Sequence, residues 1–193
     1  MFTSPVSGVV SAINRGEKRK LLNVAVEPDA QQVAKAIKVV DPAKAERSEV
    51  VEMLLESGLW TRIVERPYGV IANPDAEPKA IFVSAFDSAP LAPDYNFVLA
   101  SEKENVEAGM ALLARLTKGQ VHLSARKGAE GFMAEVKGVE YHTFEGKHPV
   151  GNVGVQIHHI DRIAKGDCSV QKNDACLQGK IKVISHLVKV ETV

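Results

Sequence analysis

A buried strand, a helix and a second strand follow one another between residues 80 and 126, and this order constrains the fold of the chain most. Residues 80–85 (AIFVSA) form a nearly continuous apolar run, typical of a strand covered on both faces of a parallel sheet. Residues 102–116 have apolar side chains at helical spacing, and QVHLSAR (120–126) is a second strand. The helical stripe comprises Val106, Met110, Leu113 and Leu116. This order predicts a right-handed βαβ unit with parallel strands.

Further elements extend the prediction on both sides of this unit. Residues 138–144 (GVEYHTF) predict a third short strand, and residues 59–78, rich in proline, predict a loop. Residues 49–57 predict a short amphipathic helix, with Ser48 as N-cap and Gly58 at its C-terminal end. Residues 180–193 alternate as an edge strand would, within an otherwise polar, aperiodic tail. The predicted fold class is therefore α/β, with a Rossmann-like parallel sheet.

The N-terminal segment has the pattern of a β-hairpin. Apolar runs at residues 8–13 and 21–26 flank a basic turn, NRGEKRK (14–20). A proline followed by a glycine and alternating apolar residues also resembles half of a biotinyl/lipoyl-type barrel-sandwich. An isolated hairpin is marginal in water, so this one needs a partner sheet. The turn lacks a Met-Lys-Met-type carrier site, which favours a scaffold, although modification of Lys18 or Lys20 stays open.

Composition excludes several classes of protein. Lys+Arg and Asp+Glu both number 24, so the net charge is zero and no basic field is available to bind nucleic acid. The longest apolar stretches are shorter than the roughly 20 residues that a membrane span needs, and the N-terminus does not have the pattern of a signal peptide. The two cysteines, Cys168 and Cys176, favour a reducing compartment. We expect a protein that faces the cytosol.

A glycine-rich segment, GKHPVGNVGVQIHH (146–159), is the first candidate site. Gly146, Gly151 and Gly154 make a loop open enough for backbone N–H groups to face an anion. The segment lacks a GxGxxG or P-loop motif, so a plain glycine-rich turn is the more common interpretation. The adjacent His158 and His159 would point to opposite faces of a strand, so we expect one core-facing and one exposed imidazole. Even with His148 they lack an acidic partner, so we expect no metal site here.

Two other segments carry candidate residues. SAFDS (84–88) lies at the predicted carboxyl end of a parallel strand, where ligands bind in open α/β sheets. Asp87 there could bind a ribose or, more commonly, cap a turn. Residues 58–68 combine aromatic surface with planar donors, as binding sites often do. An aromatic side chain that packs this loop onto the sheet is an equally good interpretation. The residues concerned are Trp60, Arg62, Arg66 and Tyr68.

Five motifs, in this order, resemble the A subunit of the Na⁺-translocating NADH:quinone oxidoreductases. They are SPVSGVVSAINRGEKR (4–19), LLESGLWTRIVERPY (54–68), KAIFVSAFDSAPLAPD (79–94), GMALLARLT (109–117) and HPVGNVGVQIHHID (148–161). The resemblance covers residues 3–161, about four-fifths of the chain. Relative to the family, we expect the sequence to be truncated at both ends, with a divergent tail after Asp161.

The resemblance implies a division of the chain into a partial barrel-sandwich hairpin (1–28), a connector (29–48), a Rossmann-like domain (49–161) and the tail (162–193). It implies a peripheral subunit on the cytoplasmic face of the bacterial inner membrane, bound to other subunits of the sodium-pumping complex. Such a subunit supports electron transfer to quinone coupled to Na⁺ export without a redox centre of its own, while NADH and flavins bind partner subunits.

The resemblance also assigns the candidate residues. The family's A subunit has been linked to quinone binding. A quinone bound here would contact Trp60, Arg62, Arg66 and Tyr68, which supply ring faces and donors. The loop with Gly146, His148, Gly151 and Gly154 would be a vestigial nucleotide loop. Two rival interpretations remain: a stand-alone Rossmann-type protein that binds a nucleotide or flavin, and a carrier domain modified on a hairpin lysine.

Overall fold

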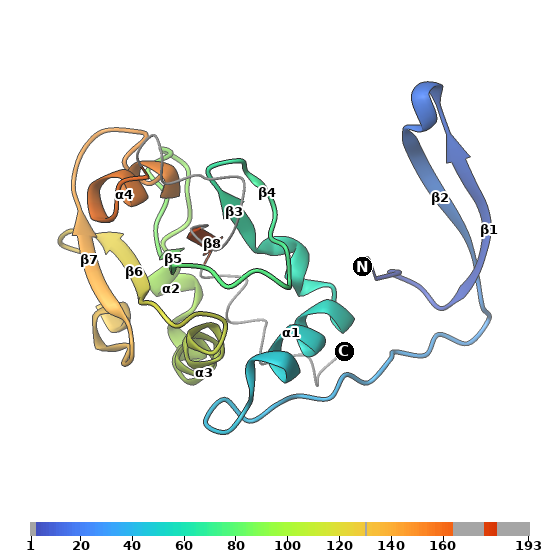
Figure 1. Cartoon of the computed structure of the whole chain (residues 1–193), viewed down its shortest axis with the longest axis horizontal. Helices are drawn as coiled ribbons and strands as arrows, with labels where there is room; N and C mark the ends of the chain where they lie inside the picture. The colour runs from blue at the N-terminus through green and yellow to red at the C-terminus, as the bar shows by residue number, and fades with distance from the viewer. Residues whose placement is uncertain (1–2, 130, 164–175, 181–193) are drawn as a thin grey trace.

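A computed structural model describes residues 3–129, 131–163 and 176–180. Figure 1 shows an α/β body and, beside it, a two-stranded hairpin at the end of an extended connector. The body contains a six-stranded sheet with the order β4-β3-β8-β5-β6-β7.

The predicted βαβ unit is present at the centre of the sheet. Strand β5 (Ala80–Ser84) pairs in parallel with β6 (Val121–Arg126), and helix α3 (Lys103–Ala114) connects them. Every residue of β5 is buried, which explains its apolar sequence. The predicted third strand is β7 (Glu140–Phe144), parallel to β6.

The tail supplies a strand that the sequence did not predict. Strand β8 (Cys176–Lys180) pairs in parallel with β5 on the side away from β6. Its sequence, CLQGK, has neither an apolar run nor an alternation, so its pattern gives no signal. The edge strand expected over 180–193 lies outside the described residues, apart from Lys180.

The predicted loop over 59–78 is partly wrong, because it contains a second small hairpin. A short turn of 3₁₀ helix (Leu59–Arg62) leads into β3 (Val64–Arg66) and β4 (Val70–Ile71). These strands pair antiparallel, and β3 also pairs antiparallel with β8. The hairpin thus forms the edge of the sheet.

The two faces of the sheet are covered by different helices. Ile81 and Val83 of β5 pack in the main core, whereas Ala80 and Phe82 pack in a second cluster on the other face. Helices α1 (Arg47–Glu56) and α3 supply the main core, and α4 (Val153–Ile160) supplies the second. Residues i and i+2 of a strand share a face, so this separation follows from the strand geometry. The burial predicted for the helical stripe is confirmed for Val106, Met110 and Leu113 of α3. Leu116 is buried too, but it lies two residues beyond the end of the helix.

Helix α1 begins two residues earlier than predicted. Its N-cap is Glu46, not Ser48: the Glu46 side chain accepts from the backbone of Glu49, and the Glu49 side chain accepts from the backbone N–H of Glu46. This reciprocal capping box satisfies two N–H groups at the start of the helix, whereas a serine cap alone would satisfy one. Gly58 follows the helix with φ +73°, the left-handed conformation that favours glycine.

The N-terminal hairpin pairs β1 (Gly8–Arg15) with β2 (Leu21–Pro28) in antiparallel register, as predicted. Nearly all of its residues are exposed, including large apolar side chains. The most exposed are Val9, Val10, Ile13, Leu21 and Leu22. Within the part of the chain that the structure describes, no sheet covers these side chains.

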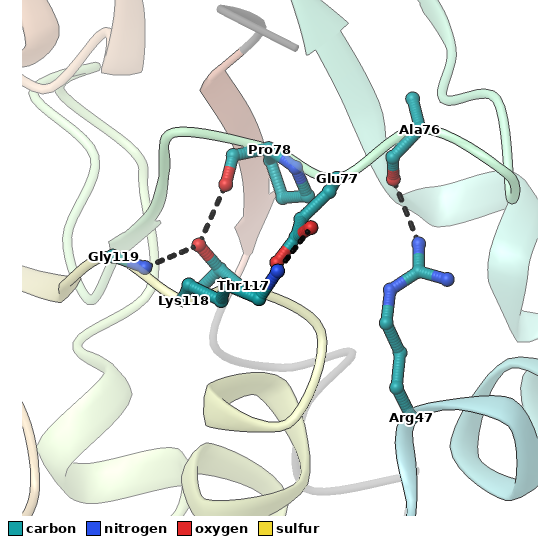
Figure 2. Close-up of polar contacts among 7 residues, drawn as sticks. All are labelled: Arg47, Ala76, Glu77, Pro78, Thr117, Lys118 and Gly119. Atoms are coloured by element: carbon teal, nitrogen blue, oxygen red, sulfur yellow. Dashed lines mark hydrogen bonds and ion pairs between the residues drawn. The ribbon is translucent and has the colours of Figure 1, made fainter.

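Polar contacts fix the loops at the amino ends of β5 and β6 (Figure 2). The buried Thr117 hydroxyl donates to the carbonyl of Pro78 (2.7 Å) and accepts from the N–H of Gly119 (2.9 Å). Arg47 of α1 donates to the carbonyl of Ala76 at 2.7 Å. These bonds connect the segment before β5 to helix α1 and to the turn that follows α3.

Candidate functional site

The strand order places a candidate site at the carboxyl end of β5. From β5 the chain proceeds through β6 to β7 and then returns to β8 on the opposite side of β5. Where the chain connections of two neighbouring parallel strands run in opposite directions, a crevice forms outside the carboxyl ends of those strands. Ligands of open α/β sheets bind in this crevice. The loop after β5, SAFDS, is therefore at the position that the sequence predicted for a site.

Side chains within this loop hold its own backbone. The Ser84 hydroxyl donates to the carbonyl of Phe86 at 2.8 Å, and Nε2 of the buried Gln156 in α4 donates to the Ser84 hydroxyl at 3.2 Å. A carboxylate oxygen of Asp87 accepts from the N–H of Ala89 at 3.0 Å. Asp87 thus makes the turn-capping contact that the sequence favoured over ribose binding.

The glycine-rich loop packs directly against the loop after β5. The N–H of Gly151 donates to the Ser88 hydroxyl at 2.9 Å, and Nδ1 of His148 lies 3.0 Å from the same oxygen. The Ser88 hydroxyl therefore joins the two loops through both contacts, and the direction of its bond with His148 depends on the imidazole tautomer. A Cβ atom at Gly151 would lie 2.3 Å from the backbone nitrogen of Ser88. The glycine therefore permits a close approach of two backbones.

The end of the glycine-rich segment is helical, so the expected strand is wrong. The Asn152 side chain accepts from the N–H of Gly154 at 2.9 Å and caps α4. His158 and His159 lie in the last turn of this helix, and both are exposed. The expectation of one core-facing and one exposed imidazole is therefore also wrong. Asn152 is the local signal for this helix, since asparagine is a preferred N-cap residue.

Two cavities lie on either side of the loop after β5. One, of about 280 Å³, is lined by the candidate residues His148 and Gly151 together with Ser84, Asp87 and Tyr95. The other, of about 220 Å³, extends from Asp87 towards Arg126 at the end of β6. Both are small for a dinucleotide, and polar and apolar atoms contribute about equally to their linings.

A third cavity joins the two sets of candidate residues. It has a volume of about 170 Å³ and is lined by Arg66, Pro67, Gly154, Ile157, His158 and Ile163. A Cβ atom at Gly154 would lie 2.6 Å from Nη2 of Arg66. The absence of a side chain at Gly154 thus lets the guanidinium lie against the start of α4. The structure therefore brings one residue of the 58–68 segment onto the glycine-rich segment.

The other members of the 58–68 set lie apart from this cavity. Trp60 is 3% exposed, and its indole N–H donates to the carbonyl of Ala72 at 2.8 Å. This placement corresponds to the interpretation of Trp60 as a packing residue, and its ring offers no open face. Arg62 is exposed, and Tyr68 is 62% exposed near the turn between β3 and β4.

The sequence analysis missed a cluster of metal-ligating residues on the α4 face of the sheet. Nδ1 of His122 in β6 lies 3.0 Å from Nε2 of His142 in β7 and 3.4 Å from a carboxylate oxygen of Glu140. Burial lowers the pKa of His122, while the negative charge of Glu140 partly offsets this effect. The sequence feature that indicates this cluster is the spacing of Glu140 and His142, since residues i and i+2 of a strand share one face. The partner His122 has no local relation to them in sequence.

Among the described residues, no helix has the length and apolar character required to cross a bilayer. This agrees with the absence of a long apolar stretch in the sequence.

Family models match both parts of the chain. Residues 1–29 match the NqrA N-terminal barrel-sandwich hybrid domain, and residues 45–183 match the NqrA second alpha/beta domain. The fold is therefore mixed α/β with a parallel sheet and an N-terminal barrel-sandwich hybrid segment. The second match continues beyond Asp161, so the similarity extends further than the sequence motifs indicated.

Curated relatives, named as the A subunit of a Na(+)-translocating NADH-quinone reductase, are similar to the chain over most of its length. The protein of Saccharophagus degradans is 39% identical over 165 residues, which are 84% of this chain and 37% of the relative. A Neisseria gonorrhoeae protein is 36% identical over 191 residues, or 97% of this chain and 43% of the relative. The chain thus spans less than half the length of these relatives.

Among solved structures, the chain is similar to one chain of an NAD+-reducing [NiFe]-hydrogenase, with a TM-score of 0.48 and 15% identity. That match covers 75% of this chain and 30% of the other. A similarity at this level defines neither fold class nor function. The family assignment follows instead from the two domain models and the curated relatives. The chain belongs to the NqrA family, which comprises the A subunits of the Na⁺-translocating NADH-quinone reductases.

Proposed function

We propose that the chain acts within a peripheral subunit of a sodium-pumping NADH:quinone reductase, on the cytoplasmic face of the bacterial inner membrane. It supports electron transfer from NADH to quinone coupled to Na⁺ export, and it binds no redox cofactor of its own. The observation that carries this proposal is the match of both its parts to NqrA domain models, in the family order. Its partners are the other subunits of the complex, which hold NADH and the flavins.

We propose further that the α/β body is Rossmann-like and that the chain divides at residues 28, 48 and 161. The order β7-β6-β5-β8, with all four strands parallel, supports this interpretation. It corresponds to the 3-2-1-4 part of the strand order 3-2-1-4-5-6 of a dinucleotide-binding sheet. The extended segment between β2 and α1 would be the connector between the two parts.

The glycine-rich loop is proposed to be a vestigial nucleotide loop. A phosphate cradle needs backbone N–H groups that point at the ligand. Here the N–H of Gly151 is bonded to Ser88, and that of Gly154 is bonded to Asn152. Both groups already serve the packing of the loop and the cap of α4, and this supports a loop that does not bind phosphate.

Arg66 is the residue of the 58–68 segment best placed for quinone contact. Its guanidinium lines a cavity with the apolar Pro67, Ile157 and Ile163. A flat apolar ring with carbonyl oxygens needs apolar walls and a donor, and this combination supplies both. Arg62 and Tyr68 remain candidates near the turn, whereas the buried Trp60 would act only through packing.

The alternative is a stand-alone nucleotide- or flavin-binding protein. The two cavities beside Ser88 at the carboxyl end of β5 favour it, because Rossmann-type proteins bind nucleotides at that edge. A thermal unfolding experiment with NADH or FMN distinguishes the two functions. A ligand at 100 times its Kd stabilises a protein by about 2.7 kcal/mol. The subunit role predicts no shift with either compound, whereas a clear rise in Tm would establish the alternative.

The subunit role itself is tested by complementation. Membranes from cells that lack NqrA would be assayed for Na⁺-dependent NADH:quinone reductase activity, with and without this chain. Restored, sodium-dependent activity is the expected result. If the other subunits accumulate normally and activity stays at the level of the deletion strain, the chain does not perform this role.

A further inference from the structure

The side chains of His122, Glu140 and His142 meet on one face of the sheet, across the β6–β7 pair. His122 and Glu140 are direct partners in the parallel register, and His142 lies two residues further along β7. Their ligand atoms all lie within 4.8 Å of one another. We propose that these three residues bind a divalent transition-metal ion of the zinc type.

The separations of the ligand atoms fit such an ion. The nitrogen atoms of the two histidines are 3.0 Å apart, and the carboxylate of Glu140 lies 3.4 Å from His122 and 3.7 Å from His142. Zinc–nitrogen and zinc–oxygen bonds of about 2.0–2.1 Å at tetrahedral angles separate neighbouring ligand atoms by about 3.3 Å. The three observed distances lie on both sides of this value. One ion can therefore reach all three groups with only small side-chain movements.

The chemistry of the set also selects this class of ion. Two imidazole nitrogens and one carboxylate oxygen suit zinc and its neighbours in the first transition row, whereas Mg²⁺ and Ca²⁺ prefer oxygen ligands alone. Three protein ligands leave a fourth position for water, as in a His₂Glu site. The negative charge of Glu140 reduces the net charge of the occupied site. A bound ion would also replace the direct contact between the two imidazole nitrogens.

The surroundings hold the first ligand in place and leave the site open to solvent. The ring of Phe82 stacks on His122 with centroids 4.6 Å apart and an interplanar angle of 14°. His122 is 7% exposed, while the side chains of His142 and Glu140 are 22% and 53% exposed. An ion can thus enter beside Glu140 and reach a preoriented imidazole.

The position of the cluster separates it from the crevice at the carboxyl end of β5. His122 is the second residue of β6 and Glu140 is the first of β7, so both lie towards the amino ends of their strands. A bound ion would connect the edge strand β7 to the buried strand β6. Its expected effect is on the stability of the sheet, independent of any ligand in the crevice.

The test is a calorimetric titration of the untagged full chain with Zn²⁺ at neutral pH. Cys168→Ser and Cys176→Ser would be introduced in every sample, so that thiolates do not supply a competing site. We expect one ion per chain and a rise in Tm of several degrees with zinc, with no response to Mg²⁺. His142→Gln and Glu140→Gln should each weaken zinc binding at least tenfold.

His158→Gln is the matched control, because it removes an exposed imidazole of α4 outside the cluster. It should leave zinc affinity within about twofold of the parent. Glu140→Gln changes an exposed side chain, so it keeps the test valid if His142→Gln fails to fold. Three results would each overturn the proposal: no binding up to millimolar zinc, equal binding by parent and both cluster variants, or loss of binding only in His158→Gln.

Discussion

The backbone N–H of Gly151 donates a 2.9 Å hydrogen bond to the hydroxyl of Ser88, a residue 63 positions earlier in the chain. This bond joins the start of α4 to the loop after β5. It determines what the glycine-rich segment can do, because an N–H bonded within the protein is not available to an anion.

Gly151→Ala should destabilise the fold by about 1–3 kcal/mol, the usual cost of overpacking a close contact. The new Cβ would meet the backbone of Ser88 at 2.3 Å, and backbone atoms cannot move aside cheaply. Urea denaturation measures the effect.

Gly154→Ala is its matched control. The atom nearest to the new Cβ is Nη2 of Arg66, the end of a flexible side chain. We expect a change within about 0.5 kcal/mol, since alanine also favours the helix at this position. Equal losses in both variants would show that Gly151 does not make the special backbone approach.

Thr117→Val should cost about 1–3 kcal/mol, because it leaves the carbonyl of Pro78 and the N–H of Gly119 without their partner. Valine keeps the shape of threonine, so the change isolates the two bonds (Figure 2). Thermal and urea unfolding of the variant would measure this difference.

Lys118→Gln controls for the neighbouring ion pair with Glu77. The Lys118 side chain is 88% exposed, and exposed pairs contribute less than about 1 kcal/mol. A larger loss in Lys118→Gln than in Thr117→Val would refute the assignment of the stabilising role to the buried hydroxyl.

Trp60 should be shielded from iodide in the native protein. It is the only tryptophan, so the emission reports this one site. Its indole is 3% exposed and bonded to Ala72, which predicts quenching far weaker than in the urea-unfolded chain. Quenching as efficient in the native as in the unfolded protein would return Trp60 to the set of accessible quinone-contact residues.

Amide hydrogens of β1 and β2 should exchange faster than those of β5 and β6 in the isolated chain. The hairpin exposes both of its faces, whereas all five residues of β5 are buried, and local opening requires less free energy where few apolar contacts hold a strand. Mass spectrometry of exchanged peptides compares the two regions. Equal, strong protection in a chain shown to be monomeric would contradict a hairpin that needs a further sheet.

The predictability of the fold depended on whether each element has a local signal. Strand β5 was predictable because its full burial requires an apolar run, and β6 because Val121, Leu123 and Ala125 alternate with more polar residues. Strand β8 was not, since its place between β3 and β5 comes from pairing with distant strands and CLQGK has no period. Helix α4 was missed because its first turn contains Gly154, which weakens the helical pattern.

The candidate site was predictable only in outline. The position of SAFDS at a carboxyl strand end followed from the βαβ order. The contact of Ser88 with Gly151 and the meeting of His122 with His142 join residues far apart in sequence, so no local pattern indicates either. The burial of Trp60 likewise depends on the fold of the β3–β4 hairpin around it.

The central proposal is that this chain acts within a subunit of a sodium-pumping NADH:quinone reductase, and co-purification tests it most directly. The chain would be expressed with the membrane subunits of a Na⁺-translocating NADH-quinone reductase, extracted in mild detergent and separated by size-exclusion chromatography. The account predicts that it elutes with those subunits at the mass of the complex. Elution only near its own 20.9 kDa, while the membrane subunits assemble without it, would contradict the claim.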